Sequence, residues 1–275
     1  MSERADAHLH LFRGGYRGGV LRFDDLENYA ALAERYRIAA ALVVGYEGQA
    51  WAEGNNDYLA ECAAERGWVY PVAFVAEPGE LTRDQVARWG DRGFVGLSFY
   101  TFSDADAAAL AGVRGEVWRE VVGRGWLVSV NSRGRWWAAW GSVLACHPGL
   151  RVLVSHLGLP EGVDEPPTAS AAEAGLAEVL ALAESAEVRV KLSGLYAVSR
   201  PGHAWPHTAA HPYVRHILER FGVGRCVWGS DFSPHLDAVS FPQTLSWLDH
   251  LEELTAEDRG AICGGNLSKL LAETR

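Results

Sequence analysis

The sequence predicts an α/β fold, a (β/α)8 or TIM barrel. Eight short apolar segments typical of strands alternate with helical segments over nearly all of the 275 residues. A repeated strand–helix unit builds a parallel sheet, and eight units close a barrel. The first predicted strand is not followed by a Gly-x-Gly-x-x-Gly turn, which argues against a dinucleotide-binding sheet. Because no linker is evident, we expect one domain over residues 1–275.

The predicted strands are continuously apolar, as expected for a parallel sheet that is covered on both faces. The clearest one is the run IAAALVV at residues 38–44. Polar residues such as Asp24 and Asp25 can cap the helices that follow the strands. In chain order, the strands are expected near 5–11, 38–44, 69–75, 94–100, 126–130, 151–155, 188–192 and 226–229. The helices are expected at 24–37, 55–67, 82–91, 104–122, 136–146, 169–186, 209–221 and from 242 onward.

Composition limits the partners of this protein. The 25 basic and 35 acidic side chains give a net charge of −10, which disfavours nucleic acid and anionic lipid surfaces. There is no apolar run near the ~20 residues of a spanning helix, so we expect a cytoplasmic protein that acts on a small-molecule substrate. The four cysteines are far apart and predict free thiols. A homo-oligomer is compatible with these data.

Polar residues stand where several predicted strands end, which is the face that carries the chemistry of such barrels. On the first strand, His8 and His10 are two residues apart and therefore point to the same side. His156 ends the sixth strand and Asp231 follows the eighth. Three histidines and one carboxylate converging at the barrel mouth predict a catalytic centre.

Five short motifs carry a resemblance to a known family. The chain resembles the amidohydrolase-related family of the amidohydrolase superfamily, and within it the group of pyrone-dicarboxylate and sugar-acid lactonases. The resemblance implies a distorted (β/α)8 barrel and extends over nearly the whole chain. The motifs are Asp6-Ala7-His8-Leu9-His10, Ser155-His156-Leu157-Gly158, Val190-Lys191-Leu192-Ser193-Gly194, Gly229-Ser230-Asp231 and Gly265-Asn266-Leu267-Ser268-Lys269-Leu270-Leu271.

The family resemblance implies a mononuclear metal site, often zinc, built from a histidine pair on strand one, a histidine on strand five and an aspartate on strand eight. The matching positions here are His8, His10 and Asp231. On strand five the chain has Asn131 or Ser132 instead of histidine. Two mechanisms stay open. In one, the three remaining ligands hold one divalent ion, for which zinc is the leading candidate. In the other, catalysis needs no metal and the histidines polarise a substrate carbonyl.

The candidate roles follow from the chemistry of each side chain. Asp231 takes the proton of an attacking water, and His156 helps to stabilise the oxyanion. Arg133 and Arg135 can bind a substrate carboxylate, since a guanidinium group matches its two oxygens. Tyr196 and Asn131 are expected to contact the substrate. Lys191 and Tyr100 are further candidates, although a structural ion pair is favoured for Lys191.

The leading functional hypothesis is hydrolysis of a small lactone, either carboxylated or derived from a sugar. The alternative is a metal-dependent decarboxylase of an aromatic or muconate-type acid, which needs a firmly held ion. A third reading is a ligand-binding barrel without catalysis. We expect substrate specificity to lie in the loops after Phe12, Tyr46, Phe102, Arg135 and Tyr196.

Overall fold

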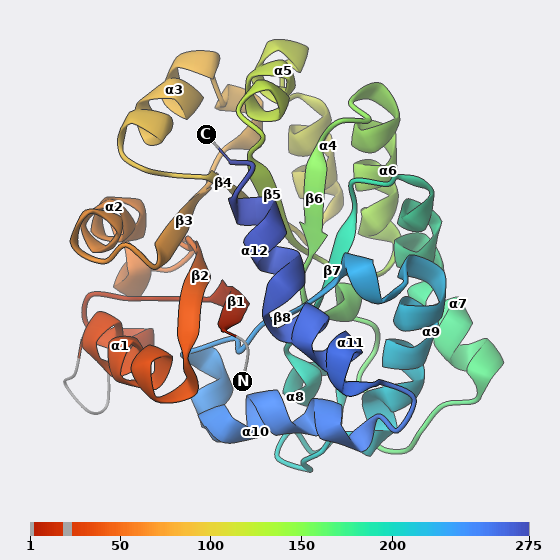
Figure 1. Cartoon of the computed structure of the whole chain (residues 1–275). Helices are drawn as coiled ribbons and strands as arrows, with labels where there is room; N and C mark the ends of the chain where they lie inside the picture. The colour runs from red at the N-terminus through yellow and green to blue at the C-terminus, as the bar shows by residue number, and fades with distance from the viewer. Residues whose placement is uncertain (1–2, 19–23, 275) are drawn as a thin grey trace.

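The computed structural model describes residues 3–18 and 24–274. Within them, eight parallel strands form one sheet in the order β1 to β8, with helices outside it (Figure 1). The predicted (β/α)8 barrel is thus confirmed. The strands are β1 (Arg4–Leu9), β2 (Ile38–Val44), β3 (Val69–Phe74), β4 (Gly96–Thr101), β5 (Leu127–Ser132), β6 (Arg151–Val154), β7 (Arg189–Leu192) and β8 (Cys226–Trp228).

The helices follow the predicted order, with three corrections. A short helix that was not predicted, α8, follows the seventh strand, and the helical tail expected from 242 onward contains three helices. The expected single helix over 104–122 is two helices, because Gly112 caps the end of the first one and Arg114 is the N-cap residue of the next. The helices are α1 (Asp25–Tyr36), α2 (Asn55–Glu65), α3 (Arg83–Asp91), α4 (Asp104–Ala111), α5 (Gly115–Gly123), α6 (Trp137–Cys146), α7 (Ala169–Ala181), α8 (Leu195–Val198), α9 (His211–Phe221), α10 (Phe241–Ser246), α11 (Ala256–Gly260) and α12 (Asn266–Leu271).

The barrel closes where the first and last strands meet. Leu9 pairs with Phe232, and the backbone N–H of Asp231 donates to the carbonyl of His8 over 2.7 Å. Helix α12 lies across the opposite end of the barrel, beside β1 and β8 (Figure 1). Asn266 at its start donates to the carbonyls of Val223 and Cys226, which ties the helix to β8. The closing motif of the sequence therefore seals one end of the barrel.

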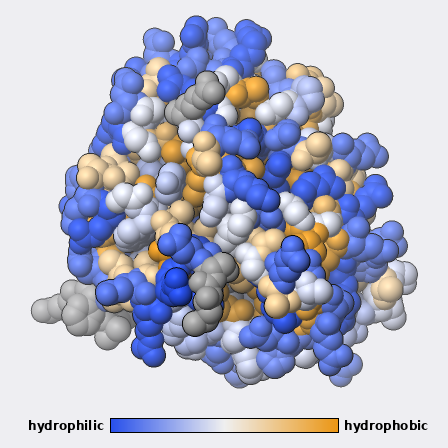
Figure 2. Space-filling view, viewed as in Figure 1, coloured by the Kyte–Doolittle hydropathy of each residue, from blue (hydrophilic) through white to orange (hydrophobic). Residues whose placement is uncertain are grey.

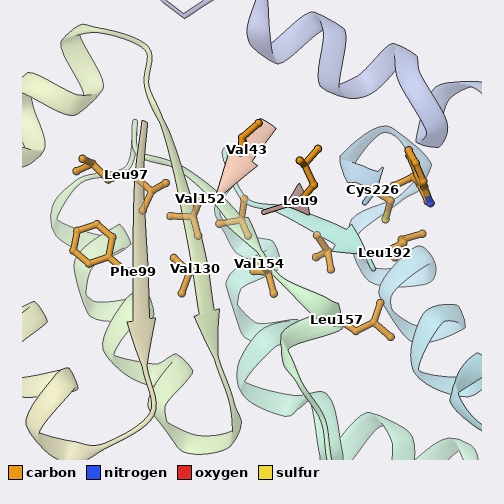
Figure 3. Close-up of a cluster of buried hydrophobic side chains, with 14 of the residues drawn as sticks. Leu9, Val43, Leu97, Phe99, Val130, Val152, Val154, Leu157, Leu192 and Cys226 are labelled. Carbon is orange, nitrogen blue, oxygen red and sulfur yellow. The ribbon is translucent and has the colours of Figure 1, made fainter. Parts of the chain in front are cut away.

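Two apolar layers enclose the strands. Outward-facing residues pack against the helices, and Figure 3 shows part of this layer with Val130, Val152 and Val154 on β5 and β6. Inward-facing residues form a second cluster at the α12 end, where Leu127, Leu153 and Val227 meet Leu267, Leu270 and Leu271 of α12. Two positions beyond Leu127 and Leu153 are the buried polar residues Ser129 and Ser155, so the barrel interior changes from apolar to polar along its axis.

Hydrophilic residues cover most of the face around α12, with smaller hydrophobic patches between them (Figure 2). In the described ranges, no helix has both the length and the apolar character that a membrane crossing needs. The cysteines in these ranges are free thiols, as predicted, although Cys146 is exposed.

Candidate active site

Three histidines and one aspartate meet at the carboxyl end of the barrel. The Nε2 atoms of His8 and His10 are 3.2 Å apart. Asp231 Oδ1 lies 3.6 Å from His8 Nε2 and 3.9 Å from His10 Nε2. Its other oxygen, Oδ2, is 3.9 Å from His156 Nδ1. The structure therefore brings together the four residues for which the sequence predicts a shared site.

The buried carboxylate of Asp6 holds this cluster in place, although the sequence alone indicated no role for it. Asp6 accepts hydrogen bonds from the backbone N–H groups of His8 and Ser230, and from the phenol of Tyr29. It thereby joins the strand that carries His8 to the turn that carries Asp231. Burial raises the pKa of Asp6 to about 6. The signal was available, since Asp6 begins the first motif, but the motif alone does not say what the carboxylate binds.

Two of the four site residues have a left-handed backbone conformation, which residues other than glycine rarely adopt. His156 has φ 53° and Asp231 has φ 58°. Such conformations cost about 1–3 kcal/mol each and persist where the surrounding structure imposes them. Gly194 is part of that surrounding, since a Cβ at this position would lie 2.3 Å from His156 Nδ1. The glycine of the third motif therefore makes room for the imidazole.

Burial sets the protonation state of the cluster. It raises the pKa of Asp231 to about 6, although His10 and Tyr196 oppose this shift. It lowers the pKa of His10 to about 4 and, together with nearby Lys191, that of His156 to about 3. The pKa of His8 is lowered well below its usual value for the same reason. Near pH 7 the site therefore holds three neutral imidazoles and a carboxylate.

A layer of polar side chains lies beneath His8. The ammonium group of Lys191 is 3.0 Å from His8 Nδ1 and donates to Ser129 Oγ over 2.6 Å. Ser155 Oγ lies 3.3 Å from the same His8 nitrogen. Lys191 is completely buried, and burial lowers its pKa to about 7. The predicted structural ion pair is replaced by hydrogen bonds to a histidine and a serine.

The cluster opens into a cavity of about 660 Å³ with largely aromatic walls. Asp231 Oδ2 accepts a hydrogen bond from Tyr196 over 2.6 Å. The buried Oδ1 of Asn131 has no hydrogen-bond partner, whereas Ser132 turns away and donates to Thr101. Of these two strand-five residues, Asn131 lines the cavity and Ser132 does not. The aromatic lining residues are Phe12, Tyr16, Tyr46, Trp51, Phe74, Tyr100, Phe102 and Tyr196.

The two arginines proposed for carboxylate binding do not line this cavity. Arg135 forms an exposed ion pair with Asp104, at 2.8 Å. Arg133 is exposed, and its guanidinium group lies 5.7 Å from the ring centre of Phe102. Among the lining residues of the described chain, Arg17 is the one arginine or lysine, and its side chain is 67% exposed at the rim. Sequence reasoning missed Arg17, Tyr16 and Trp51.

The donor set fits a single divalent ion. Two ligand atoms on one tetrahedral zinc ion are about 3.3 Å apart. The distances among His8 Nε2, His10 Nε2 and Asp231 Oδ1 are 3.2, 3.6 and 3.9 Å. His8, His156 and Asp231 form a second such group, with ligand atoms within 4.8 Å of one another. Either set leaves a coordination position free for water or substrate.

The fold and the site define a (β/α)8 hydrolase with a histidine–aspartate centre. More particularly, the model of the family described as Amidohydrolase matches residues 5–271, so the chain belongs to the amidohydrolase family. The resemblance found in the motifs and the prediction of a hydrolase are confirmed at this level.

A curated relative and two solved structures are similar to this chain. L-fucono-1,5-lactonase from Burkholderia ambifaria is 33% identical over 129 residues, which cover 44% of this chain and 41% of that protein. A zinc-containing amidohydrolase from Burkholderia multivorans has a TM-score of 0.79 at 21% identity, with 98% of this chain and 99% of that chain covered. A putative 2-pyrone-4,6-dicarboxylic acid hydrolase from Pseudomonas putida has a TM-score of 0.74 at 20% identity, with 98% of each covered.

Proposed function

We propose that this protein hydrolyses a small, uncharged lactone derived from a sugar acid. The observation that carries the proposal is the combination of a histidine–aspartate floor with aromatic walls that, over residues 3–18 and 24–274, contain no buried arginine or lysine. The partial similarity to an L-fucono-1,5-lactonase supports the same substrate class.

The walls of the cavity favour a neutral substrate over a dicarboxylate. A carboxylate removed from water needs a cationic or multiple hydrogen-bonding partner, which arginine supplies best. Arg17, at the rim, already faces Asp237 at 3.6 Å. Aromatic rings instead suit the apolar faces of a sugar ring. Asn131 also lines the cavity, and its side-chain amide is a hydrogen-bonding group of the kind that a substrate hydroxyl needs.

Hydrolysis then follows from the geometry of Asp231. Tyr196 holds Oδ2 by a hydrogen bond, which leaves Oδ1 to accept a proton from the attacking water. The water oxygen bonds to the lactone carbonyl carbon while imidazole groups stabilise the oxyanion. The ring C–O bond then breaks, and the leaving alkoxide takes the proton from Asp231. The sum is lactone plus water giving a hydroxy acid.

His8, His10 and Asp231 are the residues that would hold a zinc ion. Such an ion would supply Lewis-acid polarisation of the substrate carbonyl. The cavity walls and the contact between Tyr196 and Asp231 keep the same roles in either case.

A substrate panel tests the proposal. Purified protein is given aldonic acid lactones, muconolactone and 2-pyrone-4,6-dicarboxylate in weak buffer with a pH indicator, and aromatic hydroxy acids with detection of carbon dioxide. Metal content is measured on the same sample, and Asp231→Asn serves as the inactive control. We expect acid release from the neutral lactones. Turnover confined to the dicarboxylate, release of carbon dioxide, or no turnover at all contradicts the proposal.

A further inference from the structure

We propose that the outer part of the cavity is a subsite for a second sugar ring, so that the substrate is a two-ring sugar lactone rather than the lactone of a single sugar acid. This outer subsite is formed by Tyr16 and Trp51, which both line the cavity. The inference rests on the proposed function, because it takes the histidine–aspartate cluster as the place where the lactone ring opens. It adds the size of the substrate and the residues that recognise its second ring.

The first argument is the size of the cavity. The described part of the chain lines a cavity of about 660 Å³. A six-carbon lactone has about 12 non-hydrogen atoms, and it fills at most on the order of 360 Å³ even if each atom takes the ~30 Å³ of a water molecule in the liquid. When this lactone lies at Asp231, the remaining space has room for a second ring.

The second argument is an aromatic wall that leads from the catalytic cluster towards solvent. The ring of Phe12 is stacked with that of His10, and their ring centres are 5.9 Å apart. Phe12 in turn contacts Trp51 and Tyr16, with ring centres 4.8 and 6.2 Å apart. His10 and Phe12 are buried, whereas Tyr16 and Trp51 are partly exposed. The outer subsite is therefore separated from the catalytic histidine by one ring and lies nearer to the mouth.

The shape and the polar groups of the outer subsite indicate what it binds. The rings of Tyr16 and Trp51 are 5.3 Å apart and almost perpendicular, at 87°, so they form a corner. Aromatic rings suit the apolar faces of a sugar ring. Gln49 and Arg17 also line the cavity, and their exposed side chains can donate to sugar hydroxyl groups. A purely apolar second ring would leave these donors unused, so this corner suits a sugar.

The loop that carries Trp51 is held by hydrogen bonds within the protein. Asn55, the first residue of α2, accepts from the backbone N–H of Tyr46 over 3.1 Å. Its side-chain amide donates to the carbonyl of Leu11 over 2.7 Å, which ties the loop after β2 to the segment after β1. A binding surface that is already ordered loses less conformational entropy when a ligand binds. The outer subsite is therefore organised in advance for its ring.

Matched lactones test the proposal on the wild-type protein. Glucono-1,5-lactone has one ring, whereas cellobiono-1,5-lactone and melibiono-1,5-lactone carry a second sugar ring on different oxygens of the same lactone. Acid release is followed with a pH indicator and corrected for spontaneous hydrolysis. We expect kcat/KM for at least one two-ring lactone to be about 10-fold higher or more, mainly through a lower KM. Equal or lower values for both two-ring lactones overturn the proposal.

Two tryptophan variants test the residues of the outer subsite. Trp51→Ala removes one side of the corner, and Trp136→Ala is the matched control, because the indole of Trp136 donates to Asp104 outside the cavity. The measured quantity is the ratio of kcat/KM for the preferred two-ring lactone to that for glucono-1,5-lactone. We expect this ratio to fall at least about 5-fold in Trp51→Ala and to stay within about twofold in Trp136→Ala. An unchanged ratio in Trp51→Ala overturns the proposal, and the ratio does not depend on how much of the protein is folded.

Binding of the corresponding lactams separates this inference from the proposed function. The lactams have an amide in place of the ester, which resists hydrolysis, so they report on binding alone. Calorimetry should give a Kd about 10-fold lower for a two-ring lactam than for the single-ring lactam. If this difference is found but no lactone is hydrolysed, the proposed function fails and the outer subsite stands. If lactones are hydrolysed but the lactams bind equally, the outer subsite fails and the proposed function stands.

Discussion

The two ends of the barrel interior are built on the same strands and differ in almost every property. At the α12 end, Leu127 and Leu153 form a closed apolar layer with the last helix. Two residues further along these strands, Ser129 and Ser155 face Lys191 and His8. Side chains two positions apart on a strand share a face, so one step of the alternation separates core from active site.

The comparison shows how stability and chemistry are divided along the barrel axis. Burial of the apolar layer stabilises the folded state. Burial of the ionisable groups in the polar layer destabilises it in part. Burial raises the pKa values of Asp6 and Asp231 to about 6, which means that their ionised forms are disfavoured in the folded state. Substitutions at the polar end should therefore change mainly the catalytic rate, and substitutions at the apolar end should change mainly the free energy of unfolding.

The largest effect is expected for Asp231→Asn at the polar end. Loss of the proposed general base should lower kcat for the substrate about 1,000-fold. Because a buried carboxylate is removed, the melting temperature at pH 7 should not fall. Steady-state kinetics and calorimetry measure both quantities. Residual activity within about 10-fold of the wild type would show that the base lies elsewhere.

Leu153→Ala tests the apolar end. Truncation of this fully buried side chain should lower the free energy of unfolding by about 3 kcal/mol, while kcat changes less than about twofold. Leu236→Ala is the matched control, since Leu236 is 54% exposed and its truncation should leave the stability unchanged. Chemical denaturation and kinetics on the three proteins check the separation. A large loss of kcat in Leu153→Ala would contradict the separation, because it would show that packing at the α12 end controls catalysis at the other end.

Asp25 gives a pH test at the closure of the barrel. It accepts hydrogen bonds from the N–H of Phe12 and the hydroxyl of Ser233, and burial raises its pKa from 3.8 to about 6. Between these values the folded state binds more protons than the unfolded state, so the Asp25 contribution to stability falls as pH rises from 4 to 7. The stability of Asp25→Asn relative to wild type should therefore increase by on the order of 2 kcal/mol over this range.

Unfolding experiments with urea at both pH values measure this difference. Asp6 and Asp231 also have raised pKa values, but they are present in both proteins and cancel in the comparison. A difference in stability that does not change with pH would contradict the assigned shift.

Trp51→Ala should change substrate binding more than turnover. Trp51 lines the cavity and packs against Phe12, with ring centres 4.8 Å apart. Loss of this wall should raise KM about 10-fold with little change in kcat. Trp136→Ala is the control, because the indole of Trp136 donates to Asp104 outside the cavity. Equal kinetic effects of the two substitutions would exclude a specific role for Trp51.

The smallest effect is expected for Arg135→Ala. Its ion pair with Asp104 is exposed, and exposed pairs contribute about 0–1 kcal/mol. The free energy of unfolding should fall by no more than about 1 kcal/mol. The value of kcat/KM should stay within about twofold of the wild type. A substrate carboxylate bound by Arg135 would instead give a loss of 10-fold or more. Kinetics on neutral and carboxylated lactones would detect it.

The sequence predicted those features that depend on periodicity and on strand ends. Strand β2 has the predicted bounds, and His8, His10, His156 and Asp231 meet as expected from their places in the chain. The break between α4 and α5 was missed because an alanine-rich segment of good helix formers leads directly into Gly112 and helix begins again only three residues later, at Gly115. Residence in the cytoplasm and the oligomeric state stay predictions.

Loop side chains could not be placed because tertiary contacts decide their directions. Arg135 is drawn to Asp104, 31 positions earlier in the chain, while Trp51 and Tyr16 reach the cavity from loops after other strands. For Lys191 a signal was present, since it stands between Val190 and Leu192 in a buried strand. Its partners His8 and Ser129 lie on β1 and β5, and only the closed barrel brings them together.

The seam between β1 and β8 has a consequence for biosynthesis. His8 and Asp231 lie 223 positions apart in the chain, so a ribosome must make every residue between them before the two can meet. Until then, the first strand carries its histidines without the carboxylate and the turn that complete the site. Contacts of such high sequence separation form late and slow folding. The nascent chain is therefore inactive until its last strand has docked.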